Sequence, residues 1–396
     1  MSSEQNILVL MGSFNMGGAE SQAVQLVRLL LESGRFRVHL ACLTREGVLL
    51  EEALQLGLRE ITEFPLTSFY DRNMVVQLRR FRRFLKERKI TVAHSQDFYM
   101  NTFGILGAAL SRVPVRIAFC GEMVANRTPA HRILQRTSLR LATAIHANSE
   151  AVKRDLMREG VAAAKITVVY NGLDLARVRA PREFQRAEAL AAFGLPTSGR
   201  RFVTIVANLR HEVKDHPMFL RAARRVREAV PGAAFIIAGE GELEGSIRAL
   251  AAELGLERDT FFTGRCERLA EMLALSEVCV LSSKSEGFSN SILEYMGAGR
   301  AVVVTDVGGA REVVTDGETG YVVASGDDAA MAERIISLLQ DPSGARLMGE
   351  RGRQLIERKF SSRAQLENTE RLYETLLAEL GPNPAQLARS VRREGA

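Results

Sequence analysis

Short apolar runs alternate with longer amphipathic stretches along most of the chain. The runs lie at residues 7–11, 38–43, 91–94, 115–119, 144–147 and 166–170 in the first half, and at 202–207, 234–238, 261–263, 278–281, 301–305 and 321–323 in the second. The runs are largely apolar and show no strict alternation with polar residues, which is typical of parallel strands covered on both faces. Because the intervening stretches have helical periodicity, the pattern predicts an α/β fold with parallel sheets.

The two groups of strands are separated by residues 171–201, where glycines and prolines stand among charged residues, as they do in linkers and turns. At 396 residues the chain is also too long for one ordinary core. We therefore predict two Rossmann-like, doubly wound domains at 1–175 and 176–360 that face each other across a cleft. We expect 361–381 to form a C-terminal helix that packs back on the N-terminal domain, and 382–396 to form a flexible tail.

The composition, 46% hydrophobic and 25% charged, is that of a soluble globular protein. No apolar run approaches the ~20 residues that a membrane-spanning helix needs. The start of the chain lacks the basic, apolar and small-residue pattern of a secretory signal, and the four cysteines show no metal-ligand spacing. We therefore expect a cytoplasmic protein with reduced thiols.

The net charge of +6 predicts an affinity for anions. We expect no nucleic-acid partner, because the sequence has no helix-turn-helix or finger pattern and no basic strand with interleaved aromatics. Residues 77–89 carry seven cations beside an apolar side, and Arg132, Arg136 and Arg140 recur on one helical face. Such helices either pack on a sheet and show their charges to water, or draw the protein to the inner face of an anionic membrane or to a pyrophosphate-linked acceptor.

The strongest candidate site follows the apolar run at 278–281. Glu286 and Glu294 stand eight residues apart there, with Gly287 and small polar residues between them. A strand, a glycine turn and a helix beginning near Ser289 present N–H groups and the positive end of the helix dipole to a phosphate. Glu286 then lies in the turn, within reach of sugar hydroxyls, and Glu294 lies in the helix, where it can accept hydrogen bonds from a ribose. The alternative is that Ser289 caps the helix and both carboxylates are solvated.

A second candidate lies in the segment after the run at 202–207. Arg210 and Lys214 share this short segment, and two fixed cations there can neutralise a leaving diphosphate without a metal. No Asp-x-Asp pair stands in a setting suited to a divalent ion, so we expect no metal and no cofactor. The alternative is two ordinary surface cations.

Glycines mark a third candidate near the start of the chain. Gly17 and Gly18 lie between the first apolar run and a helical stretch, where they permit close backbone approach to a substrate. Neither this segment nor Gly239-Glu240-Gly241 has the G-x-G-x-x-G spacing of a dinucleotide-binding turn. This counts against a nicotinamide-dependent dehydrogenase.

Taken in order, these elements resemble the family-4 retaining glycosyltransferases (glycosyl transferases group 1), which have the GT-B fold. The matching segments are Gly17-Gly18-Ala19-Glu20, Ala147-Asn148-Ser149-Glu150, Tyr170-Asn171-Gly172-Leu173-Asp174, Arg210-x4-Lys214, Phe262-Thr263-Gly264-Arg265, Glu286-x7-Glu294 and Val307-Gly308-Gly309. Each segment is weak by itself, but seven in the same order span nearly the whole chain.

The resemblance implies that Arg210, Lys214 and Glu286 are catalytic: the two cations hold the donor diphosphate and Glu286 contacts the transferred sugar. It also implies that Glu294 binds the donor ribose. The remaining donor-binding positions that it implies are Phe288, Ser289, Asn290 and Ser291 around the sugar and phosphates, Arg265 and Cys266 beside the base, and Gly17 and Gly18 against the diphosphate.

The sequence departs from the family at one position. Many relatives have a histidine after the strand at 115–119, whereas this chain has Cys120. Either that role is dispensable, or a neighbour such as Glu122 takes it over, or activity is lost. His94, at the end of the run at 91–94, is a further acceptor-side candidate, with a histidine satisfied at a strand end as the alternative.

The resemblance implies a metal-independent, retaining glycosyltransferase that moves a sugar from a nucleotide sugar, with a UDP-sugar as the family-level expectation. We expect a glycan or lipid-linked acceptor, used in the synthesis of cell-surface polysaccharide or glycolipid. Two other classes stay open: a GT-B sugar-nucleotide epimerase, and a non-catalytic protein that binds nucleotide sugars.

Overall fold

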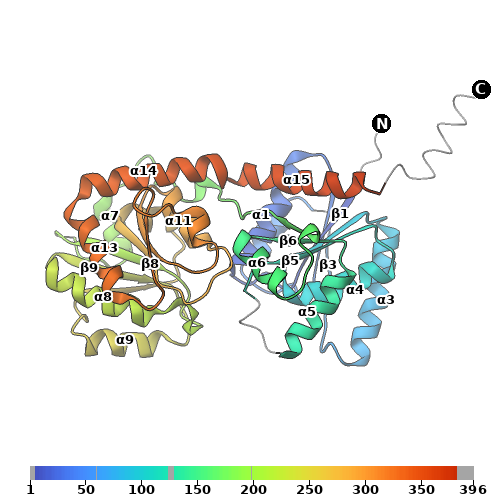
Figure 1. Cartoon of the computed structure of the whole chain (residues 1–396), viewed down its shortest axis with the longest axis horizontal. Helices are drawn as coiled ribbons and strands as arrows, with labels where there is room; N and C mark the ends of the chain where they lie inside the picture. The colour runs from blue at the N-terminus through green and yellow to red at the C-terminus, as the bar shows by residue number, and fades with distance from the viewer. Residues whose placement is uncertain (1–4, 59, 124–128, 198, 381–396) are drawn as a thin grey trace, which may run out of the picture. The chain divides into compact units, whose positions relative to one another are not determined.

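The computed structural model describes residues 5–58, 60–123, 129–197 and 199–380. The chain divides into two compact units. Unit 1 consists of Met1–Tyr170 with Gln365–Ala396, and unit 2 of Asn171–Ala364. Figure 1 shows a sheet flanked by helices in each unit.

Unit 1 contains a parallel sheet with the strand order β3-β2-β1-β4-β5-β6-β7. Its strands are β1 (Asn6–Met11), β2 (Arg37–Cys42), β3 (Ile61–Glu63), β4 (Val92–Ser95), β5 (Val115–Cys120), β6 (Ala144–Ala147) and β7 (Ile166–Val168). Its helices are α1 (Gly18–Ser33), α2 (Leu50–Gln55), α3 (Arg72–Glu87), α4 (Phe98–Leu110), α5 (Pro129–Leu141), α6 (Glu150–Arg158) and most of α15 (Ser362–Ala378).

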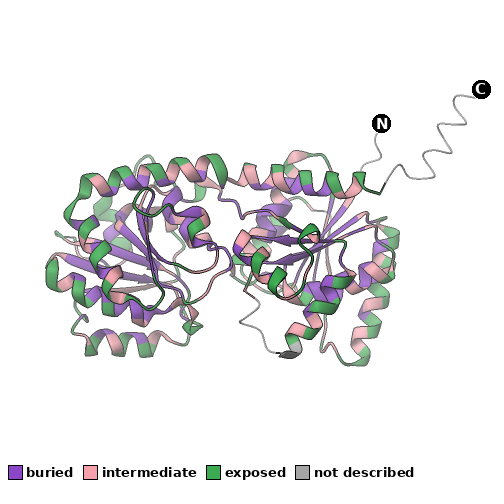
Figure 2. Ribbon diagram, in the orientation of Figure 1, coloured by how far each residue is buried: buried purple, intermediate pink, exposed green. Residues whose placement is uncertain are grey.

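Strand β1 shows why the strands of this sheet are largely apolar. Successive side chains of a strand point to opposite faces. Ile7 and Val9 belong to the core cluster that includes α1 and Tyr373 of α15, whereas Leu8 and Leu10 belong to the cluster formed with α3 and α4. Both faces are therefore covered, and the strand is buried from residue 7 to residue 11, in a sheet that is largely coloured as buried in Figure 2.

Unit 2 contains a second parallel sheet, with the strand order β10-β9-β8-β11-β12-β13. Its strands are β8 (Arg201–Val206), β9 (Ala233–Ala238), β10 (Thr260–Gly264), β11 (Ser276–Leu281), β12 (Ala301–Thr305) and β13 (Tyr321–Val323). Its α-helices are α7 (Arg186–Ala192), α8 (His216–Ala229), α9 (Glu244–Glu253), α10 (Leu269–Leu275), α11 (Asn290–Gly297), α12 (Ala310–Val313), α13 (Asp328–Gln340) and α14 (Pro342–Lys359).

The prediction of an α/β fold with two doubly wound parallel sheets is confirmed. All twelve predicted strands are present, with ends that differ by at most two residues. The prediction missed β3, a three-residue strand in which Thr62 and Glu63 are polar. In each sheet the strand order reverses direction at one point, between β1 and β4 in unit 1 and between β8 and β11 in unit 2.

Helix α15 ties the end of the chain to unit 1. Leu372 and Tyr373 enter the core of that unit, and Arg35 of unit 1 forms ion pairs with Glu370 (2.6 Å) and Glu374. The expected flexible tail at 382–396 lies outside the described residues. Over the part of the chain that the structure describes, no helix is both long enough and apolar enough to cross a membrane.

Candidate functional site

The main candidate site lies at the switch point of the sheet in unit 2. Strands β8 and β11 are neighbours there, and ligands of doubly wound sheets bind beyond the carboxyl ends of such strands. The loop after β8 carries Arg210 and Lys214, and the loop after β11 carries Glu286. The topology therefore brings together two segments that stand more than seventy residues apart in the sequence.

A sharp turn places Lys214 at this edge of the sheet. Lys214 ends a short 3₁₀ helix (Glu212–Lys214), and Asp215 follows in the left-handed region, with φ 46° and ψ 51°. Few residues other than glycine adopt this conformation. The Asp215 side chain accepts a hydrogen bond from Met218 N (3.3 Å), so the same residue turns the chain and caps α8. Such local strain is often found at functional sites.

Hydrogen bonds join the loop after β11 to this turn. Ser282 Oγ donates to the carbonyl oxygens of Lys214 (2.8 Å) and Asp215 (3.0 Å), and Lys284 N donates to Val213 O (2.8 Å). Ser282 is fully buried, where a lost hydrogen bond is costly. The two loops are thus held in one arrangement.

Glycines of the loop after β12 support the turn at Glu286 from another side. Gly309 N donates to Gly287 O (2.9 Å). Gly308 has a φ of +53°, and a Cβ there would lie 2.0 Å from Glu286 O. Only glycine can be placed so close to the backbone of Glu286. This close contact explains why the Val307-Gly308-Gly309 segment has a glycine at position 308.

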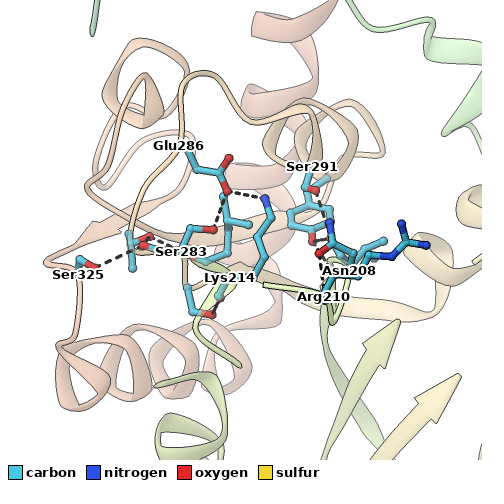
Figure 3. Close-up of polar contacts among 12 residues, drawn as sticks. Asn208, Arg210, Lys214, Ser283, Glu286, Ser291 and Ser325 are labelled. Atoms are coloured by element: carbon cyan, nitrogen blue, oxygen red, sulfur yellow. Dashed lines mark hydrogen bonds and ion pairs between the residues drawn. The ribbon is translucent and has the colours of Figure 1, made fainter. Parts of the chain in front are cut away.

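Lys214 and Glu286 form an ion pair at the centre of the site (Figure 3). Lys214 Nζ lies 2.6 Å from Glu286 Oε1, and the two side chains are only 19% and 14% exposed. Ser283 Oγ donates to the same carboxylate oxygen at 2.6 Å. The structure therefore brings the ammonium group of Lys214 to the turn that contains Glu286, as the sequence predicts.

Arg210 is not brought to that turn. Its guanidinium is about half exposed, lies 3.7 Å from Glu240 Oε1, and points away from Glu286 in Figure 3. Glu240 belongs to the loop after β9. Its neighbour Gly241 packs on the loop of Arg210 so closely that a Cβ would lie 2.2 Å from the carbonyl carbon of Leu209. Arg210 is thus anchored by its backbone at the edge of the site while its long side chain stays exposed.

The amino end of α11 lies beside the end of β8. Ser291 Oγ and the hydroxyl of Tyr295 both donate to Val206 O (3.2 Å each), and Val206 N donates to the Tyr295 hydroxyl (2.7 Å). Ser289 occupies the cap position of α11, but its hydroxyl makes no capping hydrogen bond. The alternative interpretation, in which Ser289 caps the helix through its side chain, is therefore not observed. The helix directs its positive dipole end toward the site.

Glu294 lies one turn into α11 in a poorly solvated position. Burial raises its pKa to about 7, and the positive charge of Arg177 opposes the rise. Burial and the nearby charge of Glu294 together raise the pKa of the Cys266 thiol to about 11. Glu294 and Cys266 therefore share one environment, whereas Arg265 is exposed.

Two other predicted donor-binding residues have contacts within unit 2. The ring of Phe288 packs on Phe360 with centroids 5.7 Å apart, and Asn290 Oδ1 accepts a hydrogen bond from Asn171 Nδ2 (2.8 Å). These side chains thus anchor the turn, leaving the backbone of 288–291 as the part suited to a ligand.

In unit 1 the corresponding switch point carries carboxylates that the sequence analysis did not single out. Gly12 N donates to Asp97 Oδ2 (2.5 Å), which joins the ends of β1 and β4. Glu20 folds over Gly17, where a Cβ would lie 2.2 Å from Glu20 Oε2. Burial is the main cause that raises the pKa of Glu20, followed by the charges of Asp97 and Glu122. One acidic edge of this sheet therefore contains Asp97, Glu20 and Glu122, together with the turn formed by Gly17 and Gly18.

The positions of His94 and Cys120 do not fit the acceptor-side role considered for them in the sequence analysis. His94 is fully buried: Nδ1 lies 2.8 Å from the Tyr373 hydroxyl, and Nε2 lies 3.1 Å from Nδ1 of His146. Nδ1 thus holds α15 on the sheet, and Nε2 joins β4 to β6 within the sheet. Cys120 is buried in an apolar cluster and accepts a hydrogen bond from Gln135 (3.6 Å). Neither side chain is accessible to an acceptor, which leaves Glu122 as the exposed candidate.

Within the described ranges, no three His, Cys, Asp or Glu side chains are grouped so that they could hold a metal ion.

Comparison with known proteins defines the class of fold first. The chain is similar to Anabaena HepE in complex with UDP, with a TM-score of 0.82 and 17% identity over 94% of this chain and 100% of that one. Another HepE structure is a complex with UDP-glucose. The fold of this chain is therefore similar to that of HepE over nearly the whole of both chains. It is the two-domain GT-B fold.

Family models and curated relatives then define the family. Residues 16–177 match the model described as Glycosyltransferase Family 4, and 188–355 match Glycosyl transferases group 1, which together is more than four-fifths of the chain. The putative glycosyltransferase EpsD of Bacillus subtilis is 35% identical over 40% of this chain and 42% of its own length. EpsF of the same organism, also a putative glycosyltransferase, is 28% identical over 77% and 80%. The chain belongs to the family-4, group-1 glycosyltransferases of the GT-B type.

Proposed function

We propose that the chain is a retaining glycosyltransferase that uses a nucleotide sugar, with a UDP-sugar as the expected donor. Its acceptor is a glycan or lipid-linked hydroxyl in polysaccharide or glycolipid synthesis. One observation carries the proposal: the Lys214–Glu286 pair stands beside the amino end of α11 at the switch point of unit 2. The UDP and UDP-glucose complexes of HepE support this choice of donor.

Each group at this site has a part in the proposed reaction. Lys214 and the dipole of α11 stabilise the negative charge that grows on the diphosphate as it leaves. Arg210 swings from Glu240 to the same charge when the donor binds. Glu286 accepts hydrogen bonds from the sugar, and Glu294 accepts them from the ribose.

The bond changes need positioning more than a nucleophile of the protein. The bond between the anomeric carbon and the diphosphate oxygen breaks, and the acceptor oxygen bonds to that carbon on the same face. The acceptor proton passes to the departing phosphate oxygen. Since charge on the diphosphate is balanced by protein cations, we propose that no metal is required.

Donor panels test this function. Thermal shift measures how much the melting temperature of the protein rises with UDP, GDP and ADP and with sugars linked to each. The preferred sugar nucleotide is then incubated with candidate acceptors. We expect a clear preference for one base and a glycoside with the donor's anomeric configuration, identified by NMR. An isomerised sugar formed without acceptor would favour an epimerase, and binding without turnover across a broad acceptor panel would favour a non-catalytic protein.

We also propose that unit 1 contacts an anionic membrane through the outer face of α3. Arg79, Arg83 and Lys86 are exposed on this face and have no ion pair among the described residues. Arg79, Arg83 and Lys86 line a surface hollow with Glu87 as its only acidic residue, and Val75 and Val76 are about half exposed on the same helix. Cations beside exposed apolar groups are typical of helices at membrane interfaces.

Vesicle flotation tests this contact. Each cation near an anionic surface contributes about 1 kcal/mol, so the R79Q/R83Q/K86Q variant should bind phosphatidylglycerol-containing vesicles roughly 100-fold more weakly. The variant R346Q/R351Q/R358Q is the matched control, because it removes three exposed cations from α14 of unit 2. Equal binding by both variants, or binding to pure phosphatidylcholine, would contradict the proposal.

A further inference from the structure

The two carboxylate oxygens of Glu286 have different surroundings. Oε1 receives two hydrogen bonds, from Lys214 Nζ and from Ser283 Oγ, each 2.6 Å long. No hydrogen bond to Oε2 occurs among the residues that the structure describes. Figure 3 shows the second oxygen directed away from both donors. One oxygen is therefore held by the protein, and the other is open to a ligand.

Ser283 is the more rigid of the two donors. It is fully buried, and its carbonyl oxygen accepts hydrogen bonds from Thr305 Oγ1 (2.7 Å) and Ser325 Oγ (3.4 Å). Its hydroxyl sits on a one-carbon side chain, three residues before Glu286 on the same loop. Lys214, in contrast, reaches the carboxylate through a flexible four-carbon stem. Ser283 can therefore fix the carboxylate more sharply than Lys214 can.

The two donors also differ in what else they can bind. The ammonium group of Lys214 is one of the charges that the proposed function assigns to the donor diphosphate. When it turns to the phosphates, its hydrogen bond to Glu286 weakens or is lost. A carboxylate on a glutamate rotates readily about its last bond, because that torsion has a broad distribution. Without another donor, Glu286 would lose its orientation at the moment the sugar arrives.

We propose that Ser283 is the positioning residue for Glu286. Its hydroxyl keeps Oε1 occupied while Lys214 serves the diphosphate, so Oε2 stays directed at the hydroxyls of the transferred sugar. Ser283 would thereby strengthen recognition of the sugar without touching the nucleotide. The inference rests on the proposed function, and it assigns a role to a residue that makes no contact with the substrate.

Binding measurements with and without the sugar test this role. Calorimetric titration gives the Kd of UDP and of UDP-glucose for the full-length wild type, Ser283→Ala and Ser283→Thr. We expect Ser283→Ala to leave UDP affinity within about twofold. We expect it to weaken UDP-glucose binding about fivefold to tenfold, a loss within the range of an ordinary hydrogen bond. Ser283→Thr keeps the hydroxyl and should recover most of that loss.

Ser325→Ala is the matched control, because it removes a hydrogen bond to the backbone of Ser283 but none to Glu286. It should change neither Kd. An equal loss of UDP and UDP-glucose affinity in Ser283→Ala would mean that the serine supports the loop only, and no loss would mean that Glu286 needs no second donor; either result overturns the inference. A wild type that binds neither compound would overturn the UDP-sugar donor of the proposed function, and this inference with it.

Discussion

The raised pKa of Glu294 makes the stability of unit 2 depend on pH in an unusual direction. Burial raises this pKa from 4.5 to about 7. The folded protein therefore binds a proton at Glu294 between pH 4.5 and 7 where the unfolded chain does not. The contribution of Glu294 to the free energy of unfolding is therefore present at pH 4.5 and is lost as the pH rises through 7. The replacement Glu294→Gln removes the charge and keeps the shape, so it should remove this loss.

The size of the effect follows from the shift. A change of 2.5 pKa units at 1.36 kcal/mol per unit gives about 3 kcal/mol at pH 8, and the partial solvent exposure of Glu294 lowers this to about 1–2 kcal/mol. We therefore expect Glu294→Gln to be more stable than the wild type by about that amount at pH 8. At pH 4.5 the two proteins should be nearly equal.

Urea unfolding followed by far-UV circular dichroism measures this difference, since the chain has no tryptophan to report by fluorescence. Glu253→Gln, at an exposed position of α9, is the control and should show no pH-dependent gain. A gain of Glu294→Gln that is the same at pH 4.5 and pH 8, or a wild type that is more stable than the variant at pH 8, would refute the reasoning.

Three further predictions concern the site and the core of unit 1. Lys214→Ala and Glu286→Ala should each lower the rate of sugar transfer about 10²-fold to 10³-fold with an unchanged circular dichroism spectrum, because each removes a group proposed to act at the reacting centre. Full activity in either variant would contradict the assignment of the site. Transfer should persist in EDTA, and its loss with recovery by a divalent cation would show that a metal is needed. Burial lowers the pKa of His94 and brings that of His146 to about 4, so the unfolded chain takes up protons below about pH 6.5 that the folded protein does not. The free energy of unfolding should fall as pH is lowered from 6.5 to 4, less steeply in His146→Gln, and Tyr373→Phe should cost about 1 kcal/mol at neutral pH; a flat pH profile would contradict this.

The fold could be predicted from the sequence because both sheets are buried on both faces. Continuous apolar runs such as 234–238 have few alternatives in a chain that also shows long helical stretches. Strand β3 could not be found in this way, since two of its three residues, Thr62 and Glu63, are polar and it forms no apolar run. The role of α15 in the core of unit 1 depends on Tyr373 reaching His94, a contact across 279 positions that no local pattern reveals.

The candidate site was predictable where it depends on topology. Lys214 and Glu286 follow strands that meet at the switch point, so their approach follows from the order of strands. The direction of the Arg210 side chain does not follow from the order of strands, because an exposed side chain can pair with any nearby group of opposite charge. Here that group is Glu240. Ser283 was missed because its hydrogen bond depends on the shape of one turn.

On the acceptor side, the strand position of His94 suggested access to the edge of the sheet. Burial and two occupied ring nitrogens place it in the core instead. The acidic edge did leave a signal in the sequence: Asp97 stands two residues after the end of β4 and immediately before α4, a position from which it caps α4 and binds Gly12.

The proposed function depends most directly on contact between Lys214 and the donor diphosphate, whose terminal phosphate is present in UDP and missing from UMP. Calorimetric Kd values of UMP and UDP for the wild type and for Lys214→Met isolate that phosphate in a double-difference cycle. The wild type should prefer UDP over UMP by a factor that falls at least tenfold in the variant, while UMP should bind both proteins alike. An unchanged preference in Lys214→Met would mean that Lys214 does not bind the diphosphate.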